Sequence, residues 1–128
     1  MTVRRIAALS AAALACMLGA ADATRTVRIP SHISIKSHEL RFSGRVTSPN
    51  AACRQGRHVS LYRRIAGGRD RVGVFVTGAS GKWHITVSGT AGVSMGQFYA
   101  KVRRRSEGTA GTTFVCKSAD SATIRPQP

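Results

Sequence analysis

The chain has 128 residues, 42% of them hydrophobic, and carries 20 Lys and Arg against 5 Asp and Glu, a net charge of +15. Such a length suits one domain with its own core. With so few carboxylates, a hydrolase site built from two facing acidic side chains is not expected. The positive charge favours contact with polyanions.

The start of the chain has the three parts of a secretory signal peptide. Two Arg residues form a basic n-region, residues 6–18 are uncharged and rich in Ala and Leu, and Ala-Asp-Ala at 21–23 is a small-x-small cleavage site. The apolar run is shorter than the roughly 20 residues of a transmembrane helix. A buried helix and a lipoprotein site at Cys16 are the alternatives. We expect residues 1–23 to be removed, leaving an extracytoplasmic protein, secreted or associated with the cell envelope.

Cleavage would remove Cys16 and leave one pair of cysteines, Cys53 and Cys116. In an oxidising compartment this pair predicts a single intramolecular disulfide, with two buried free thiols as the alternative. The bridge would close 63 residues of chain, the difference between the two residue numbers. By the chain-entropy model such a loop contributes about 4 kcal/mol to stability.

The remaining chain is patterned as short strands separated by turns rich in Gly. Alternation of apolar and polar residues over such segments is typical of half-buried strands in an all-β sandwich or barrel. We predict an N-terminal edge segment, 24–38, and one β-sandwich of about seven strands, 39–128. The expected strands are 39–47, 57–65, 71–77, 82–88, 97–105, 112–117 and 121–125, and residues 106–111 are expected to be a loop. The expected inward side chains include Phe42, Val46, Val59, Leu61, Val72, Val74, Val76, Trp83, Ile85, Val87, Phe98, Ala100 and Val102.

Three segments carry a resemblance to a known family. Residues 42–46 read F-S-G-R-V, residues 57–62 read R-H-V-S-L-Y, and residues 77–83 read T-G-A-S-G-K-W. Together they resemble the carboxypeptidase regulatory-like, or transthyretin-like, β-sandwich over about half of the mature domain. Gly78 departs from the acidic residue that is usual in that turn, and residues 53–56 replace a Pro-rich strand entry.

The core composition and the cysteine spacing carry two further resemblances. An inward Trp with a disulfide across the core resembles an immunoglobulin-like interior. The cysteine pattern is similar to that of small secreted proteins of high-GC Gram-positive bacteria. These resemblances imply a fold and a non-catalytic module, and no substrate.

A row of basic residues on one expected strand is the candidate contact surface. Lys101, Arg103 and Arg105 would project from the same face of 97–105, with Tyr99 at the start of the row. Arg side chains match phosphate and carboxylate groups, so anionic envelope polymers or lipid headgroups are the expected partners. Specific nucleic-acid binding is not expected, because aromatic residues for base stacking are scarce. The alternative is a solvated face that protects a strand edge, or compositional bias towards Arg.

The sequence contains no strong motif for catalysis or for metal binding. A nuclease could use His84, Glu107 and Arg103 as acid, base and phosphate clamp, but such catalysis needs these side chains to converge. The four histidines lack the spacing of a zinc site, and no cofactor is expected. The expectation is a secreted, non-enzymatic binding or structural module of the cell envelope. A small nuclease-like hydrolase, or an inhibitor that displays the loop 89–96, is the alternative.

Overall fold

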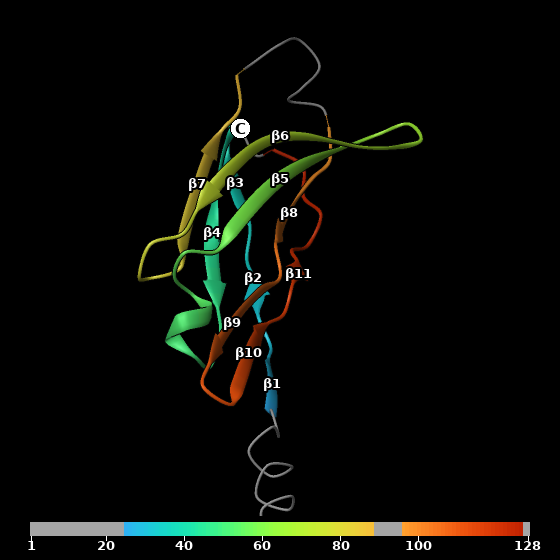
Figure 1. The fold of residues 1–128 in the computed structure, drawn as a ribbon. Helices are drawn as coiled ribbons and strands as arrows, with labels where there is room; N and C mark the ends of the chain where they lie inside the picture. The colour runs from blue at the N-terminus through green and yellow to red at the C-terminus, as the bar shows by residue number, and fades with distance from the viewer. Residues whose placement is uncertain (1–24, 89–95, 127–128) are drawn as a thin grey trace, which may run out of the picture.

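The computed structural model describes residues 25–88 and 96–126 and shows an all-β protein, as predicted. None of the described helical segments is long and apolar enough to cross a membrane. The described strands are β1 (Arg25–Ile29), β2 (His32–Ile33), β3 (Lys36–His38), β4 (Arg41–Thr47), β5 (His58–Ile65), β6 (Gly68–Val76), β7 (Lys82–Thr86), β8 (Phe98–Val102), β9 (Arg105–Thr109), β10 (Thr112–Cys116) and β11 (Ala119–Asp120), with a 3-10 helix at Ala51–Cys53 (Figure 1).

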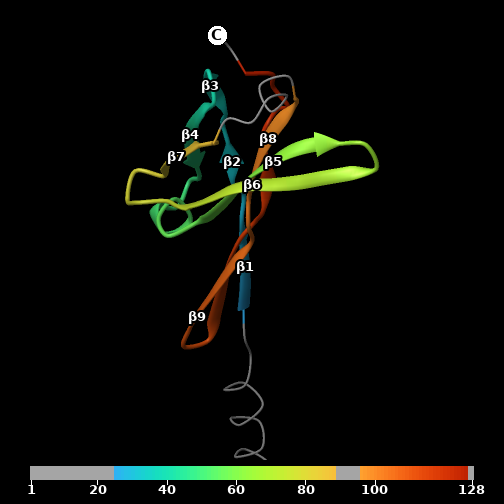
Figure 2. The ribbon, with the colours of Figure 1, turned by 90° about the horizontal axis from the view of Figure 1, so that it is seen from above.

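Two antiparallel sheets form the layers of the sandwich. One has the order β11-β8-β5-β6; in the other, β4 pairs with β2 and β3 along the chain and with β7. Figure 2 shows β3, β4 and β7 as one layer, and β5, β6 and β8 as the other. Each strand therefore has one face towards the opposite sheet and one face towards solvent.

The core between the sheets follows the predicted alternation. Phe42 of β4 and Phe98 of β8 are fully buried, with ring centroids 4.6 Å apart. Trp83 is 2% exposed, and its indole Nε1 donates a hydrogen bond to the Ser34 carbonyl oxygen at 3.2 Å. The other predicted core residues found buried are Val46, Val59, Leu61, Ile85, Val87, Ala100 and Val102.

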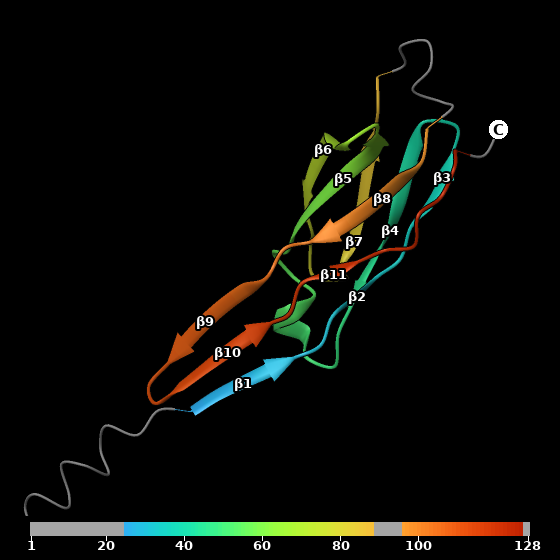
Figure 3. The ribbon, with the colours of Figure 1, turned by 90° about the vertical axis from the view of Figure 1, so that its right-hand side faces the viewer.

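A third sheet, β1-β10-β9, extends from one end of the sandwich (Figure 3). β1 runs parallel to β10, and β9 pairs with β10 as a hairpin. The predicted disulfide is confirmed: Cys53 and Cys116 are bonded, with an S–S distance of 1.97 Å. The bond joins the 3-10 helix to the end of β10, and Ile29 packs against it in a small second core.

A buried arginine ties this third sheet to the sandwich. Arg57 is fully buried, and its guanidinium donates hydrogen bonds of 2.7–2.9 Å to four acceptors. Burial lowers the pKa of Arg57 from its ordinary value, and the positive charge of Arg105 lowers it further. The acceptors belong to four separate segments of the chain: the Ser31 hydroxyl and the carbonyls of Cys53, Arg103 and Lys117.

The structure corrects the predicted strand phase of β6. Leu61 pairs with Gly73 but Tyr62 pairs with Arg71, so Val72 is an extra residue in a β-bulge. Beyond the bulge the faces are reversed: Val74 and Val76 are 64% and 55% exposed rather than buried. Gly73 takes an inward position instead, where a Cβ atom would lie 2.4 Å from Cγ2 of Ile85.

Three segment boundaries also differ from those predicted. Residues 97–105 do not form one strand, because β8 ends at Val102 and β9 begins at Arg105. The expected loop 106–111 is largely β9 and its hairpin turn. Near the C-terminus, β11 comes earlier than expected and 121–125 contributes only a bridge from Ile124 to Phe98. The predicted sandwich of about seven strands therefore has additional strands, several of which are only two or three residues long.

Candidate anion-binding face

The outer face of the β3–β4–β7 sheet collects basic side chains in three rows across the strands. Ser43 of β4 is flanked in register by Lys36 of β3 and His84 of β7. The next row joins Arg41 to His38 and Thr86, and the third pairs Arg45 with Lys82. We call this surface the basic face; it consists of Lys36, His38, Arg41, Ser43, Arg45, Lys82, His84 and Thr86.

Strand alternation puts these residues outside. β4 buries Phe42 and Val46 and exposes Arg41 and Arg45, while β7 buries Trp83 and Ile85. Apart from Ser43, which is half-buried, all residues of the basic face are exposed. Neighbouring strands lie about 4.7–4.9 Å apart, and same-face residues along a strand about 6.6–6.8 Å apart. The cations therefore form a grid that an extended polyanion can contact at several points.

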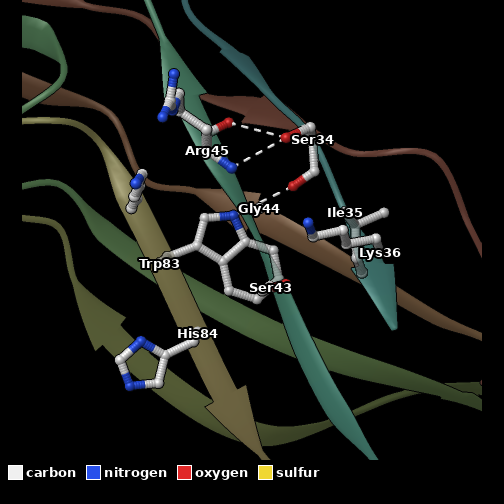
Figure 4. Close-up of a pocket in the computed structure, with 9 residues that line it drawn as sticks. Ser34, Ile35, Lys36, Ser43, Gly44, Arg45, Trp83 and His84 are labelled. Carbon is white, nitrogen blue, oxygen red and sulfur yellow. Dashed lines mark hydrogen bonds between the residues drawn. The ribbon is translucent and has the colours of Figure 1, made fainter. Parts of the chain in front are cut away.

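Two adjoining hollows, each of about 530 Å³, lie along this sheet. Both are lined by Lys36, Ser43 and His84, so the middle row is common to the two. Figure 4 shows the first hollow. Arg45 and Lys82, the pair of the third row, also line it. The second hollow adds His38 and Arg41 from the other end of the face.

The segment that carries Lys36 is fixed by contacts around Gly44 (Figure 4). The Arg45 backbone N–H donates to the Ser34 hydroxyl at 2.9 Å, and the Ser34 N–H donates to the Arg45 carbonyl at 3.0 Å. Gly44 allows this close approach, because a Cβ atom there would lie 1.9 Å from the Ser34 carbonyl oxygen. With the Trp83 hydrogen bond to the same carbonyl, these contacts hold the chain in place between β2 and β3.

No carboxylate belongs to the basic face. Within the described ranges, the two ion pairs lie elsewhere: Arg63 with Asp70 at 3.9 Å, and Arg105 with Glu107. His84 packs its ring against Phe75, with centroids 4.6 Å apart, rather than against an acid. The positive charges of the basic face are therefore available to an external anion.

The stripe predicted from the sequence is divided between two sheets. Tyr99 is 8% exposed and its ring stacks on Tyr62 with centroids 5.4 Å apart, whereas Lys101 is half-buried further along β8. Arg103 is exposed in the connection to β9. Arg105 begins β9, pairs with Glu107 and donates to the Gln55 carbonyl at 2.7 Å. The expectation that Lys101, Arg103 and Arg105 share one strand is wrong; their role in binding stays a prediction.

The structure does not bring together the residues considered for a nuclease. His84 lies on β7, Arg103 follows β8, and Glu107 lies on β9, paired with Arg105. Across 25–88 and 96–126, no group of three or more His, Cys, Asp or Glu side chains is placed to hold a metal ion. The loop considered for an inhibitor, 89–96, and the signal peptide, 1–23, lie outside the described residues except for Gly96.

Sequence reasoning identified individual outward residues of the basic face but not the face itself. The alternation that predicts inward positions for the apolar residues of β4 and β7 also places Arg41, Arg45, Lys82 and His84 outside, where the structure has them. Their assembly depends on β4 pairing with β7, which starts 35 residues further along the chain than the end of β4. No local pattern encodes such a pairing, so the surface becomes visible only in the folded chain.

Comparison with protein-family models, with curated protein sequences and with solved structures found no match. The resemblance to carboxypeptidase regulatory-like domains therefore stays a prediction.

Proposed function

We propose that the protein is a secreted, non-enzymatic binding module that holds anionic polymers of the cell envelope on its basic face. The observation that carries this proposal is the grid of cations without a carboxylate across β3, β4 and β7. Arg and Lys side chains arranged in rows can meet successive phosphate or carboxylate groups of one polymer. Such contacts add up in affinity although each exposed pair contributes little.

Export is supported by two independent features of the chain. The first 23 residues have the pattern of a signal peptide, and the structure forms a disulfide between Cys53 and Cys116. Disulfides persist in oxidising compartments, which for a bacterium lie outside the cytoplasmic membrane. Anionic polymers and lipid headgroups are the abundant polyanions in that location.

Binding to long-chain inorganic polyphosphate, measured by fluorescence anisotropy over a range of salt concentrations, tests the proposal. The variant Lys36→Ser/Arg41→Ser/Arg45→Ser should bind at least tenfold more weakly. If each lost contact releases about 0.7 counterion, as for single-stranded nucleic acid, the slope of log affinity against log salt should fall by about 2. Poly-glutamate in a parallel titration shows whether carboxylates substitute for phosphates.

The matched control is Arg28→Ser/Arg104→Ser/Lys117→Ser, which removes the same charge from exposed positions that line a smaller hollow of about 380 Å³ near the third sheet. It should lose much less affinity than the basic-face variant. Equal losses in the two variants would show that net charge alone drives binding and would refute the basic face as a site. Shortening of the polymer during incubation would instead favour the hydrolase alternative.

A third variant, Lys101→Ser/Arg103→Ser/Arg105→Ser, examines the stripe predicted from the sequence. Because Arg105 is already paired with Glu107, we expect this variant to lose less affinity than the basic-face variant. A larger loss would move the site from the β3–β4–β7 sheet to the stripe.

A further inference from the structure

The outer face of the opposite sheet carries a second basic cluster, built around two stacked tyrosines. Tyr62 of β5 and Tyr99 of β8 are paired in register, and their rings lie 5.4 Å apart at an interplanar angle of 24°. The Arg69 guanidinium lies 4.1 Å from the Tyr62 ring centroid and donates to the Tyr99 hydroxyl at 2.9 Å. Arg64 lies 5.0 Å from the centroid of the Tyr99 ring.

Strand register brings three arginines together at this place. Arg64 pairs with Arg69 across the β5–β6 hairpin, and Arg71 pairs with Tyr62. All three arginines are exposed. We call this surface the arginine–tyrosine face; it consists of Tyr62, Arg64, Arg69, Arg71 and Tyr99.

The tyrosines hold two of the guanidinium groups in place before any ligand arrives. Stacking on an aromatic ring restricts the side chain of an arginine while leaving most of its N–H donors free. A cation that is ordered in advance loses less conformational entropy when it binds an oxyanion. Asp120 of β11 pairs in register with Lys101 and its carboxylate interacts with Arg69, while Asp70 pairs with Arg63; with three exposed arginines, the face keeps a net positive charge.

The two basic surfaces face away from each other. The basic face belongs to the β3–β4–β7 layer, and the arginine–tyrosine face belongs to the β8–β5–β6 layer (Figure 2). The buried core lies between these layers, which in packed sheets are about 10 Å apart. One polymer segment on each side would therefore be held at a fixed separation by a single copy of the protein.

We propose that the arginine–tyrosine face is a second binding site for anionic polymer, and that one molecule cross-links two polymer chains through its opposite faces. This inference rests on the proposed function of the basic face. Bridging needs both sites, whereas attachment to one chain needs only one of them.

The experiment measures binding and bridging separately on beads coated with long-chain polyphosphate. Binding is measured as the amount of protein that the beads remove from solution. Bridging is measured as aggregation of the beads, followed by light scattering. Wild type should do both, with aggregation that declines at excess protein because each site is then filled separately. The variant Arg64→Ser/Arg69→Ser/Arg71→Ser should still bind through the basic face, but should need at least about tenfold more protein to aggregate the beads.

Two further variants keep the interpretation clear. Arg71→Glu changes the charge of the face without removing either arginine that stacks on a tyrosine, and it should also weaken aggregation. Arg28→Ser/Arg104→Ser/Lys117→Ser, which removes the same charge elsewhere, should aggregate the beads as wild type does.

The outcomes separate this inference from the proposed function. Failure of wild type to bind the beads would refute the proposed function itself. Binding without aggregation, or unchanged aggregation by the Arg64, Arg69 and Arg71 variants, would overturn the second site. In the latter case bridging would come from self-association of copies that bind through one face.

Discussion

Replacing the buried Arg57 with Met should destabilise the protein by about 3–5 kcal/mol, because four hydrogen-bond acceptors lose their donor while the cost of burying one cation is removed. The change keeps a long apolar side chain and removes the guanidinium, which donates to Ser31 and to the carbonyls of Cys53, Arg103 and Lys117. A hydrogen bond from a charged donor contributes about 1.5–3 kcal/mol, so four such bonds give an upper limit of about 6–12 kcal/mol. The Met variant also no longer buries a positive charge that lacks a carboxylate partner, and this gain offsets several kcal/mol of that loss.

Urea unfolding with the disulfide intact measures the free energy of unfolding, and Arg28→Met, at an exposed position, is the matched control. Amide exchange adds a local readout. Because Arg57 joins the segments that lead into the third sheet, exchange should accelerate in β9 and β10 before β4 and β5. A variant as stable as wild type, with unchanged exchange, would show that the desolvation of Arg57 costs as much as its hydrogen bonds contribute.

The remaining predictions concern the core, a close backbone approach and the disulfide. Trp83→Ala should cost about 3–5 kcal/mol in urea unfolding, as other large core truncations do, and a wild-type midpoint would show that the indole contributes no packing. Gly44→Ala should lower the thermal midpoint by several degrees, because the new Cβ would meet the Ser34 carbonyl at 1.9 Å; Gly78→Ala, where nothing lies near and φ is not positive, tests how much of the loss is local to Gly44. Non-reducing peptide mapping of the exported protein should recover Cys53 and Cys116 in one linked fragment, and free thiols would contradict the bond seen here.

The parts of the fold that sequence could predict are those where one face of a strand is buried. β4 and β7 alternate strictly between apolar and polar residues because both line the main core. The disulfide followed from the parity of the cysteines once Cys16 was assigned to the signal peptide. These features are local in the chain or independent of topology, so no knowledge of strand pairing was needed.

The elements of the fold that the sequence does not predict lack such a local pattern of apolar and polar residues. β9 reads Arg-Ser-Glu-Gly-Thr and has no apolar residue, because its sheet extends beyond the sandwich and has no deep core to cover. The bulge at Val72 reverses the faces of β6, and an extra residue in a ladder cannot be seen without its partner strand. The sequence pattern predicts Arg57 only as the first residue of a strand, because its burial depends on carbonyls from distant segments.

The distribution of charge bears on whether the excess of Arg and Lys is functional or compositional. Compositional bias would add cations wherever solvent allows them and would give no reason for carboxylates to avoid one surface. Of the carboxylates in the described residues, Asp70 and Glu107 form ion pairs away from the basic face, and Asp120 lies opposite Lys101 in the other sheet. Glu39 is exposed in the turn that joins His38 to Arg41, so this carboxylate borders the basic face. A hollow lined by cations without ion pairs is not unique to the basic face, because Arg28, Arg104 and Lys117 line another of about 380 Å³ and belong to neither described ion pair. Equal removal of charge from the basic face and from the third sheet therefore distinguishes the two explanations, since bias predicts the same loss of affinity from both.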